Sequence, residues 1–269
     1  MLLDDVRGFV FDIDGTLVHR AGDHLRVQPG AREVLARIRL TGRPLVLFTN
    51  GSHAPPESFA AALRAAGLEI GNEEVLTPLC SLPVYLAAGR HERSVLLFGT
   101  APAREYVVRS GVRVLDRRNG DQPDVVFVAH PEAADFEELE HAARAVLAGA
   151  RLLTGSYARA YAGADGLIFS RGAMLTAALA KATGARPVVV GKPSRAAVRT
   201  VVDRLGVNSE QVAVIGDDLG MDVALGRLGG SRTVLVRSGI TGGIDLTRVP
   251  ANRRPDAAVD GVAELLEWL

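Results

Sequence analysis

The chain has few of the features that would tie it to an oxidising compartment, a membrane or a nucleic acid. Its 269 residues contain one cysteine, Cys80, which excludes a disulfide framework and a cysteine metal cluster. Lysine plus arginine and aspartate plus glutamate number 31 each, so no basic excess predicts nucleic-acid binding. No apolar run approaches the roughly 20 residues that span a bilayer, and Met1–Asp5 lacks the basic start of a signal peptide. We therefore expect a cytoplasmic protein with no nucleic-acid or membrane partner.

Short apolar runs rich in β-branched residues alternate with segments of helical period along the chain. The expected strands are Gly8–Phe11, Pro44–Phe48, Val95–Phe98, Val125–Ala129, Leu152–Thr154, Pro187–Val190, Val212–Ile215 and Thr233–Val236. The expected helices are Ala31–Leu40, Pro56–Ala66, Ala103–Ser110, Phe136–Ala148, Met174–Thr183, Arg195–Leu205 and Met221–Leu228. Glycines typical of helix C-termini follow five of them, namely Gly42, Gly67, Gly149, Gly184 and Gly206. This alternation predicts an α/β fold with parallel sheets covered on both faces.

The most informative segment is the end of the first expected strand, Phe11-Asp12-Ile13-Asp14-Gly15-Thr16-Leu17. Residues i and i+2 of a strand point to the same side, and Gly15 can end the extended path at once. We therefore expect the carboxylates of Asp12 and Asp14 to be directed at one point. Two acids held that close repel each other unless a cation, a proton or a chemical role compensates. An Asx turn would explain one aspartate before a glycine, but it explains two less well.

Three further expected strands also end in polar residues. These are Thr49 and Asn50, then Lys192, and then Asp217 and Asp218 with Asp222 close behind. Ligands of open parallel sheets bind outside the carboxyl ends of the strands, so we expect these side chains to gather there. Carboxylates suit Mg²⁺, whereas a hydroxyl, a lysine and backbone N–H groups suit a phosphoryl group. A solvated lysine at a helix start is the alternative for Lys192, and we interpret Asp218 as a solvated or helix N-terminal carboxylate and not a ligand.

In their order and spacing, the four segments resemble the motifs of the haloacid dehalogenase superfamily of phosphotransferases. The resemblance implies that Asp12 is the nucleophile and that Asp14 is the general acid and base. It implies a Mg²⁺ ion bound by Asp12, by Asp217 and by the backbone carbonyl of Asp14. Asp222 would then lie behind these ligands or serve as an alternative one.

The resemblance further implies that Thr49, Asn50 and Lys192 bind the phosphoryl group. The expected function is Mg²⁺-dependent hydrolysis of a small cytosolic phosphate monoester through an aspartyl-phosphate. The substrate could be a sugar, glycerol, glycolate, nucleotide or aryl phosphate. The alternative is a non-catalytic regulatory protein that binds a phosphate ligand on the same fold. A dehalogenase is disfavoured because that branch lacks the second aspartate and needs no metal.

The place of the inserted domain decides the subclass. We expect only one loop and one helix in Val18–Arg43, between the first two motifs, which is too little for a domain. The segment between the second and third motifs has strands and helices of its own. This predicts a Rossmann-like, doubly wound parallel-sheet core, residues 1–77 and 185–269, with an inserted α/β cap domain, residues 78–184. The placement resembles the subclass IIA group with its C2-type cap. That group includes NagD-like, p-nitrophenyl phosphatase and phosphoglycolate phosphatase proteins. The resemblance also allows a homodimer through the cap.

The expected cap departs from that group at two segments. Thr154-Gly155-Ser156-Tyr157 stands where the group commonly has Thr-Asn-Pro-Asp, and Ala129-His130-Pro131 stands where Gly-x-Asp is common. Gly155–Gly172 lacks regular periodicity, and loops of that length are usually functional or mobile. We therefore name Tyr157, Arg171 and His130 as substrate contacts, with a turn residue as the alternative for His130. The other histidines are expected to be solvated, namely His19, His24, His53, His91 and His141.

Overall fold

The computed structural model describes residues 2–21, 24–89, 94–163 and 166–269, and the chain divides into two compact units. The first unit comprises Met1–Thr49, Pro56–Leu76 and Lys192–Leu269, and the second comprises Asn50–Pro55 and Thr77–Gly191. The second unit therefore extends past residue 184, where the sequence places the end of the insertion. Within the described ranges, no helix is both long enough and apolar enough to cross a membrane.

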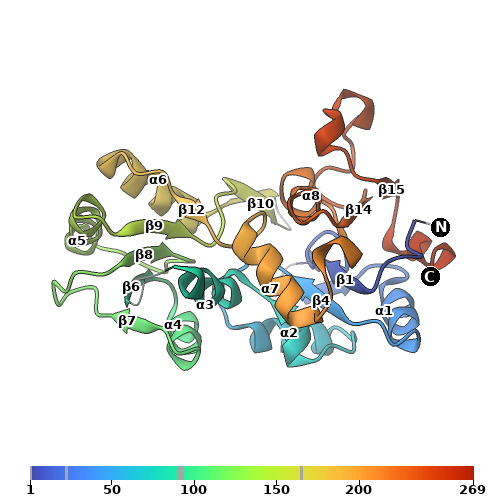
Figure 1. Ribbon diagram of the computed structural model, residues 1–269, viewed down its shortest axis with the longest axis horizontal. Helices are drawn as coiled ribbons and strands as arrows, with labels where there is room; N and C mark the ends of the chain where they lie inside the picture. Colours follow the sequence, from blue (N-terminus) through green and yellow to red (C-terminus); the bar gives the residue numbers. More distant parts are fainter. Residues whose placement is uncertain (1, 22–23, 90–93, 164–165) are drawn as a thin grey trace. The chain divides into compact units, whose positions relative to one another are not determined.

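The first unit is built on a six-stranded, all-parallel sheet in the order β15-β14-β13-β1-β4-β5 (Figure 1). Its strands are β1 Gly8–Phe11, β4 Leu45–Phe48, β5 Val75–Leu76, β13 Val212–Gly216, β14 Arg232–Val236 and β15 Ala257–Val259. Its helices are α1 Ala31–Leu40, α2 Pro56–Ala65, α7 Arg195–Leu205 and α8 Ala224–Gly229. Every residue of β1, β4 and β13 is buried, as expected for strands covered on both faces.

Several parts of the first unit differ from the expectation. Strands β5 and β15 were not among the expected strands. The segment after the first motif contains an antiparallel hairpin, β2 Val18–Ala21 and β3 His24–Val27, in addition to its helix. Its strands carry histidine and arginine in place of an apolar run, so the sequence pattern did not reveal them. The expected helix Met221–Leu228 is instead a π-helical turn, Leu219–Val223, followed by α8. Short 3₁₀ turns complete the unit at Asn72–Glu74, Ser209–Gln211, Leu246–Arg248, Ala251–Arg253 and Val262–Glu267.

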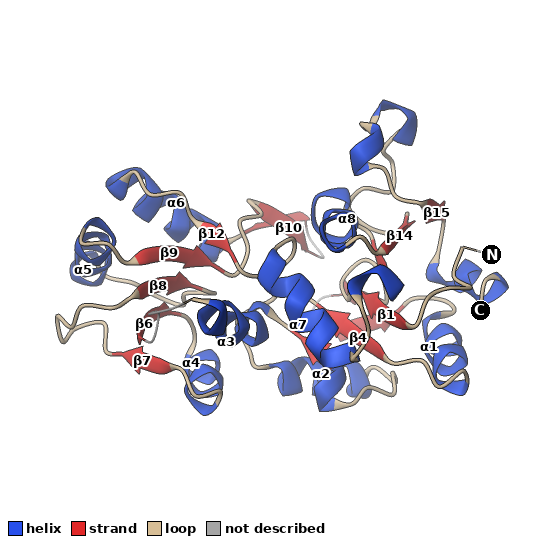
Figure 2. Cartoon of the chain, in the orientation of Figure 1, coloured by secondary structure: helices blue, strands red, loops and turns tan. Residues whose placement is uncertain are grey.

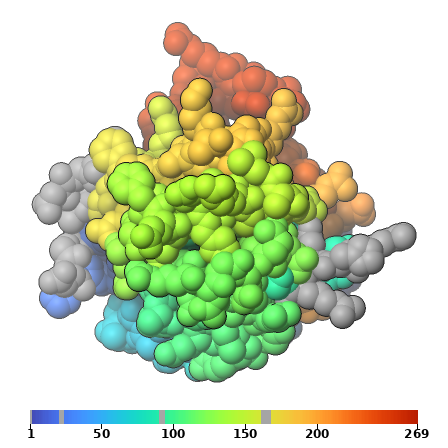
Figure 3. Space-filling model, turned by 90° about the vertical axis from the view of Figure 1, so that its left-hand side faces the viewer, coloured from blue at the N-terminus to red at the C-terminus, as the bar shows by residue number. Residues whose placement is uncertain are grey.

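The second unit has its own parallel sheet in the order β12-β9-β8-β6-β7 (Figure 2). Its strands are β6 Ser94–Phe98, β7 Arg113–Leu115, β8 Val125–Val128, β9 Arg151–Thr154 and β12 Val188–Val189. Its helices are α3 Pro78–Ala88, α4 Ala101–Arg109, α5 Phe136–Leu147 and α6 Arg171–Thr183. Figure 3 shows one surface of this unit in green to yellow. Because both units consist of parallel sheets with helices, the predicted α/β class is confirmed.

Alternate residues of β6 and β8 supply two separate hydrophobic cores. Leu97 and Phe127 pack in one core with side chains of α3 and α4. Phe98 and Val128 pack in the other with side chains of α5 and α6. This division follows from the two-residue period of a strand, which sends successive side chains to opposite faces. The sheet of the second unit is therefore buried on both sides.

Helix α3 and strands β7, β10 and β11 of the second unit were not predicted from the sequence. Helix α3 is apolar almost all round, so it lacks the amphipathic period by which helices are recognised. The expected irregular segment Gly155–Gly172 instead contains an antiparallel hairpin, β10 Ala160–Gly163 and β11 Gly166–Phe169, and the first residues of α6. Its first strand is rich in alanine and glycine, which carry little strand signal. Asp165, within this segment, lies outside the described residues.

The helix ends follow their local sequence. Ser170 and Ser194 cap α6 and α7, each accepting a hydrogen bond from the backbone N–H three residues on. Gly184 and Gly206 end the same helices in the left-handed conformation, which costs glycine little. The positions of these two helices are therefore determined largely by residues next to them in the chain.

Candidate active site

Three neighbouring strands of the first unit end in the residues that the first, second and fourth motifs contain. Asp12 and Asp14 follow β1, Thr49 follows β4, and Asp217 follows β13. The backbone N–H of Asp12 still donates to the carbonyl of Ile215 at 2.8 Å, so the ladder continues to the first acid. Because β1 lies between β13 and β4 and all three are parallel, these residues share one edge of the sheet.

Lys192 joins this edge through two carboxylates. Its Nζ lies 2.7 Å from Asp12 Oδ1 and 2.6 Å from Asp222 Oδ1, and its side chain is 2% exposed. Burial alone would lower the pKa of Lys192, but the two carboxylates outweigh it and the pKa is raised. The lysine is therefore held charged next to Asp12, and the alternative of a solvated surface lysine is wrong.

Asp217 is enclosed by backbone on two sides. Its Oδ2 accepts a hydrogen bond from the N–H of Ile240 at 2.7 Å, and the Thr241 hydroxyl donates to its backbone carbonyl. A Cβ at Gly239 would lie 1.8 Å from Asp217 Oδ2, and one at Gly15 would lie 2.5 Å from it. Glycine at both positions leaves the space that this carboxylate occupies. The loop after β14 thereby orients Asp217 towards the end of β13.

The carboxylates of Asp12, Asp217 and Asp222 form a cluster in which one oxygen of each lies within 4.8 Å of the others. Burial raises the pKa of Asp12 well above its usual value, and Lys192 only partly opposes this. Burial, reinforced by Asp222, raises the pKa of Asp217 to about 7. Both shifts arise mainly from burial, and the neighbouring carboxylates add to them. An all-oxygen donor set of this charge fits a hard divalent cation.

Asp222 differs from the other two carboxylates because both of its oxygens already have donors. Oδ1 pairs with Lys192, and Oδ2 accepts from the backbone N–H of Asp218 at 3.2 Å. With this geometry, Asp222 can hold Lys192 in place, while Asp12 and Asp217 can bind a metal. Asp218 begins the π-helical turn, where its Oδ1 accepts from the N–H of Gly220 at 2.6 Å.

Asp14 pairs with a different cation. Its Oδ1 lies 3.1 Å from Arg20 Nε, and the two side chains are 42% and 41% exposed. Asp14 Oδ1 is buried yet accepts no well-aligned hydrogen bond in the described structure, so the contact with Arg20 is an ion pair only. Asp12 and Asp14 therefore contact separate cations, Lys192 and Arg20, whereas the sequence analysis expected them to be directed at one point.

Asn50 groups with the second unit and not with the cluster of carboxylates. Its Nδ2 lies 3.5 Å from Ser156 Oγ. A Cβ at Gly191 would lie 2.5 Å from Asn50 Oδ1 and 2.3 Å from the carbonyl oxygen of Gly155. The residues that directly follow Thr49 and directly precede Lys192 are thus packed together within this unit.

His130 and Arg171 lie together in the second unit, and His53 lies beside them. The rings of His53 and His130 meet edge to face, with centroids 5.6 Å apart. Burial lowers the pKa of His130, and the positive charge of Arg171 lowers it further. A Cβ at Gly172 would lie 2.4 Å from the carbonyl oxygen of Ala129, so the start of α6 abuts the end of β8. That close approach places Arg171 next to His130.

The remaining substrate candidate, Tyr157, is 44% exposed and forms no hydrogen bond with any residue in the described ranges. His141 is not simply solvated, because its ring nitrogens lie 2.8 Å and 3.1 Å from the carbonyl oxygens of Arg117 and Asp121. His19 and His24 are exposed, as expected. His91 lies outside the described residues.

Sequence reasoning missed three contributors to these sites, namely Arg20, His53 and the loop residues Gly239 to Thr241. The loop carries a detectable signal, because Ser238-Gly239-Ile240-Thr241 follows β14 directly and β14 pairs with β13. Arg20 and His53 carry none, since an exposed basic residue in a turn or hairpin is ordinary. Their partners are decided only when distant segments meet.

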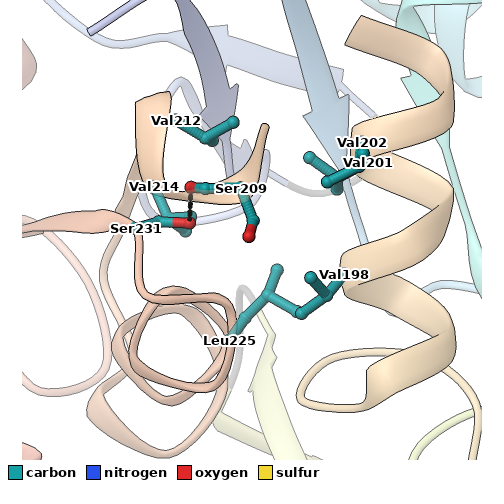
Figure 4. Close-up of a pocket in the computed structure, with 8 residues that line it drawn as sticks. All are labelled: Val198, Val201, Val202, Ser209, Val212, Val214, Leu225 and Ser231. Atoms are coloured by element: carbon teal, nitrogen blue, oxygen red, sulfur yellow. Dashed lines mark hydrogen bonds between the residues drawn. The ribbon is translucent and has the colours of Figure 1, made fainter. Parts of the chain in front are cut away.

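A small apolar pocket also lies in the first unit, and Figure 4 shows its lining. The lining residues are Val198, Val201, Val202, Ser209, Val212, Val214, Leu225 and Ser231. One of its polar side chains is already paired, because the Ser231 hydroxyl donates to the backbone carbonyl of Ser209 at 2.7 Å. With no charged lining residue, this pocket is a gap in packing and has no part in the site.

Two parts of the chain match models of a known protein family. Residues 9–113 match a family model of haloacid dehalogenase-like hydrolases, and residues 189–265 match a second, HAD-hydrolase-like model. The chain belongs to the haloacid dehalogenase superfamily. The two matched ranges contain the first, second and fourth motifs and Lys192. Membership in the superfamily therefore rests on the same strand ends as the carboxylate cluster.

Relatives within the superfamily align over nearly the whole chain. The ribonucleotide monophosphatase NagD of Escherichia coli K12 is 28% identical over 263 residues, which is 97% of this chain and 98% of NagD. The structure of p-nitrophenyl phosphatase from Archaeoglobus fulgidus superposes with a TM-score of 0.85 at 29% identity, covering 98% and 100% of the two chains. This protein is a haloacid dehalogenase phosphatase of subclass IIA.

A third relative was solved with a metal. The glycerol phosphate phosphatase of Mycobacterium tuberculosis, in complex with magnesium, superposes with a TM-score of 0.83 at 26% identity. The alignment covers 96% of this chain and 75% of that one. The carboxylate cluster of this phosphatase is in keeping with a divalent metal.

Proposed function

We propose that this protein is a Mg²⁺-dependent hydrolase of a small cytosolic phosphate monoester, acting through a phosphorylated Asp12. The observation that carries the proposal is the 2.7 Å contact between Asp12 Oδ1 and Lys192 Nζ within a cluster of carboxylates. It sets a nucleophile beside a buried cation that can hold a phosphoryl oxygen. When bound, Mg²⁺ would neutralise negative charge on the phosphoryl group, with Asp12, Asp217 and the Asp14 carbonyl as its protein ligands.

The chain's own residues then divide the steps between them. An oxygen of Asp12 attacks phosphorus and forms an acyl-phosphate, while the bond to the leaving oxygen breaks. Lys192 and the hydroxyl of Thr49 bind the transferring group, and Asp222 keeps the lysine in place. Asp14 donates a proton to the leaving oxygen and later accepts one from the water that hydrolyses the acyl-phosphate.

We assign residues 78–184, which lie within the second unit, as the cap that excludes solvent and selects the leaving group. Asn50, which directly follows Thr49 in the chain, would also bind the phosphoryl group. His130, Arg171 and Tyr157 remain the proposed substrate contacts, and the proximity of His130 to His53 and Arg171 supports the first two. A homodimer through the cap remains a prediction from the resemblance.

The substrate class stays broad in this proposal. The relatives named above act on a ribonucleotide monophosphate, on p-nitrophenyl phosphate and on glycerol phosphate. We propose a substrate of the same kind, a monoester small enough for a capped site. A screen of sugar, glycerol, glycolate, nucleotide and aryl monophosphates tests which one is hydrolysed with the highest kcat/KM.

The covalent step is tested with Asp12→Asn. An amide cannot form the acyl-phosphate, so turnover of p-nitrophenyl phosphate should be abolished while the thermal unfolding temperature changes little. After acid quenching, the parent enzyme should carry one phosphoryl group on the peptide that contains Asp12, and the variant should carry none. Asp260→Asn, at a 92% exposed position, is the matched control. Turnover of Asp12→Asn within about tenfold of the parent would exclude the proposed mechanism.

A further inference from the structure

Arg20 is a partly exposed cation beside the proposed acid and base. Its Nε lies 3.1 Å from Asp14 Oδ1, and its side chain is 41% exposed. Within the described residues, Asp14 is its one ion-pair partner. Lys192, in contrast, is 2% exposed and is matched by two carboxylates. Arg20 is therefore the better placed of the two cations to bind an additional anion from solution.

The hairpin that carries Arg20 directs it towards the acid. In the β2–β3 register Arg20 faces Leu25, and His19 faces Arg26. Because side chains alternate along a strand, Arg20 and Leu25 lie on one face and His19 and Arg26 on the other. Arg20 is thus the basic residue of the described hairpin that reaches Asp14, while Arg26 projects from the opposite face.

The distances place a substrate's leaving group next to this guanidinium. An acid that protonates the leaving oxygen must lie within about 3.2 Å of it. The 3.1 Å contact of Asp14 with Arg20 Nε then brings that oxygen within about 6 Å of the arginine. A carboxylate one carbon away from the ester oxygen can span this gap. Arginine binds carboxylates through two parallel N–H donors, which gives the contact directional preference.

We propose that Arg20 determines specificity by binding a carboxylate on the leaving group, so that the preferred substrates are phosphate esters of small hydroxy acids. The inference rests on the proposed function, because it requires Asp14 to be the acid that meets the leaving oxygen. It assigns a substrate contact within the first unit, apart from the residues of the proposed cap.

The test compares two probes of the same length. Phosphoglycolate carries a carboxylate one carbon from the ester oxygen, and 2-hydroxyethyl phosphate carries a neutral hydroxymethyl group there. The parent enzyme should hydrolyse phosphoglycolate with the higher kcat/KM. The preference is the kcat/KM for phosphoglycolate divided by the kcat/KM for 2-hydroxyethyl phosphate. Arg20→Gln should reduce this ratio by roughly tenfold to a hundredfold, the effect of one lost charge-assisted hydrogen bond. Arg20→Lys keeps the charge but loses the planar guanidinium, so its ratio should lie between those of the parent enzyme and Arg20→Gln.

The matched control is Arg26→Gln, which removes the same charge from the opposite face of the hairpin and should leave the ratio unchanged. Equal losses on both probes in Arg20→Gln would show that Arg20 only positions Asp14, and would overturn the inference. A parent enzyme that does not favour phosphoglycolate would overturn it without any variant. Failure of the proposed function is seen separately, because Asp14→Asn would then retain activity on both probes.

Discussion

Asp222 and Lys192 form a 2.6 Å ion pair in which each side chain is 2% exposed. The same lysine reaches Asp12 at 2.7 Å, so Asp222 determines where the cation stands relative to the proposed nucleophile. A buried cation that loses one of two counter-charges keeps the cost of burial with less compensation. The pair therefore links the stability of the first unit to the geometry of its proposed site.

The first prediction follows from this pair. Asp222→Asn should lower the free energy of unfolding by about 3 kcal/mol, because one buried charge is removed and its partner remains. Urea unfolding followed by circular dichroism measures the change. Asp218→Asn is the control, since its oxygen can still accept the hydrogen bond from Gly220. Equal losses in the two variants would contradict a special role for the buried pair.

Activity should require a divalent cation. Chelation with EDTA should abolish hydrolysis of an aryl phosphate, and Mg²⁺ should restore it, because the clustered carboxylates repel one another without a cation. In Asp217→Asn, the Mg²⁺ concentration for half-maximal activity should rise by at least about tenfold. Titration of the chelated enzyme with Mg²⁺ provides both values. Full activity after exhaustive chelation would refute the metal requirement.

The metal-free protein should lose stability as the pH rises towards neutrality. Burial raises the pKa of Asp217 to about 7 from an ordinary value of 3.8, so between these values the native state binds a proton that the unfolded chain does not. The free energy of unfolding must then fall with rising pH in that window, by at most on the order of 4 kcal/mol.

This pH dependence is measured by urea unfolding in EDTA at a series of pH values between 4 and 8. The decline should be shallower in Asp217→Asn, which has no carboxyl group to titrate at this position. Mg²⁺ should flatten the decline in the parent protein, because a bound cation replaces the proton. Identical slopes for parent and variant in EDTA would show that Asp217 does not titrate in this range.

Residues of the second unit should affect the choice of substrate more than the chemistry. His130→Ala, Arg171→Ala and Tyr157→Ala should change the ranking of phosphate esters by roughly 1–3 kcal/mol in kcat/KM, the range of one lost polar contact. Hydrolysis of a small aryl phosphate should change less. Arg113→Ala, an exposed arginine of β7, is the control for loss of charge. An unaltered ranking in all three variants would place selectivity elsewhere.

The sequence by itself determined the fold class and the strand ends that carry the motifs. Buried strands such as β1 and β13 consist of unbroken apolar runs, and the residues that follow them are local features of the chain. The caps of α6 and α7 are equally local, because Ser170 and Ser194 bind backbone only three residues away. Patterns of this kind can be read from the sequence because the residues that form them are neighbours in the chain.

Elements without such a pattern were not predicted from the sequence. Helix α3 is apolar almost all round, so no polar face marks its period. The β2–β3 and β10–β11 hairpins are short and lack runs of β-branched residues, so their strands are held by pairing with one another and not by local preference.

Only the tertiary structure decided which polar side chains meet. Arg20 pairs with Asp14, Lys192 with Asp222, and His53 with His130, although nothing in the flanking residues marks them as partners. The backbone of Ile240 holds Asp217 because β14 lies beside β13 in the sheet. Contacts between distant segments depend on the order of the strands in each sheet and on the path of the loops between them. The interaction energy of each pair is gained only when folding brings its two members together.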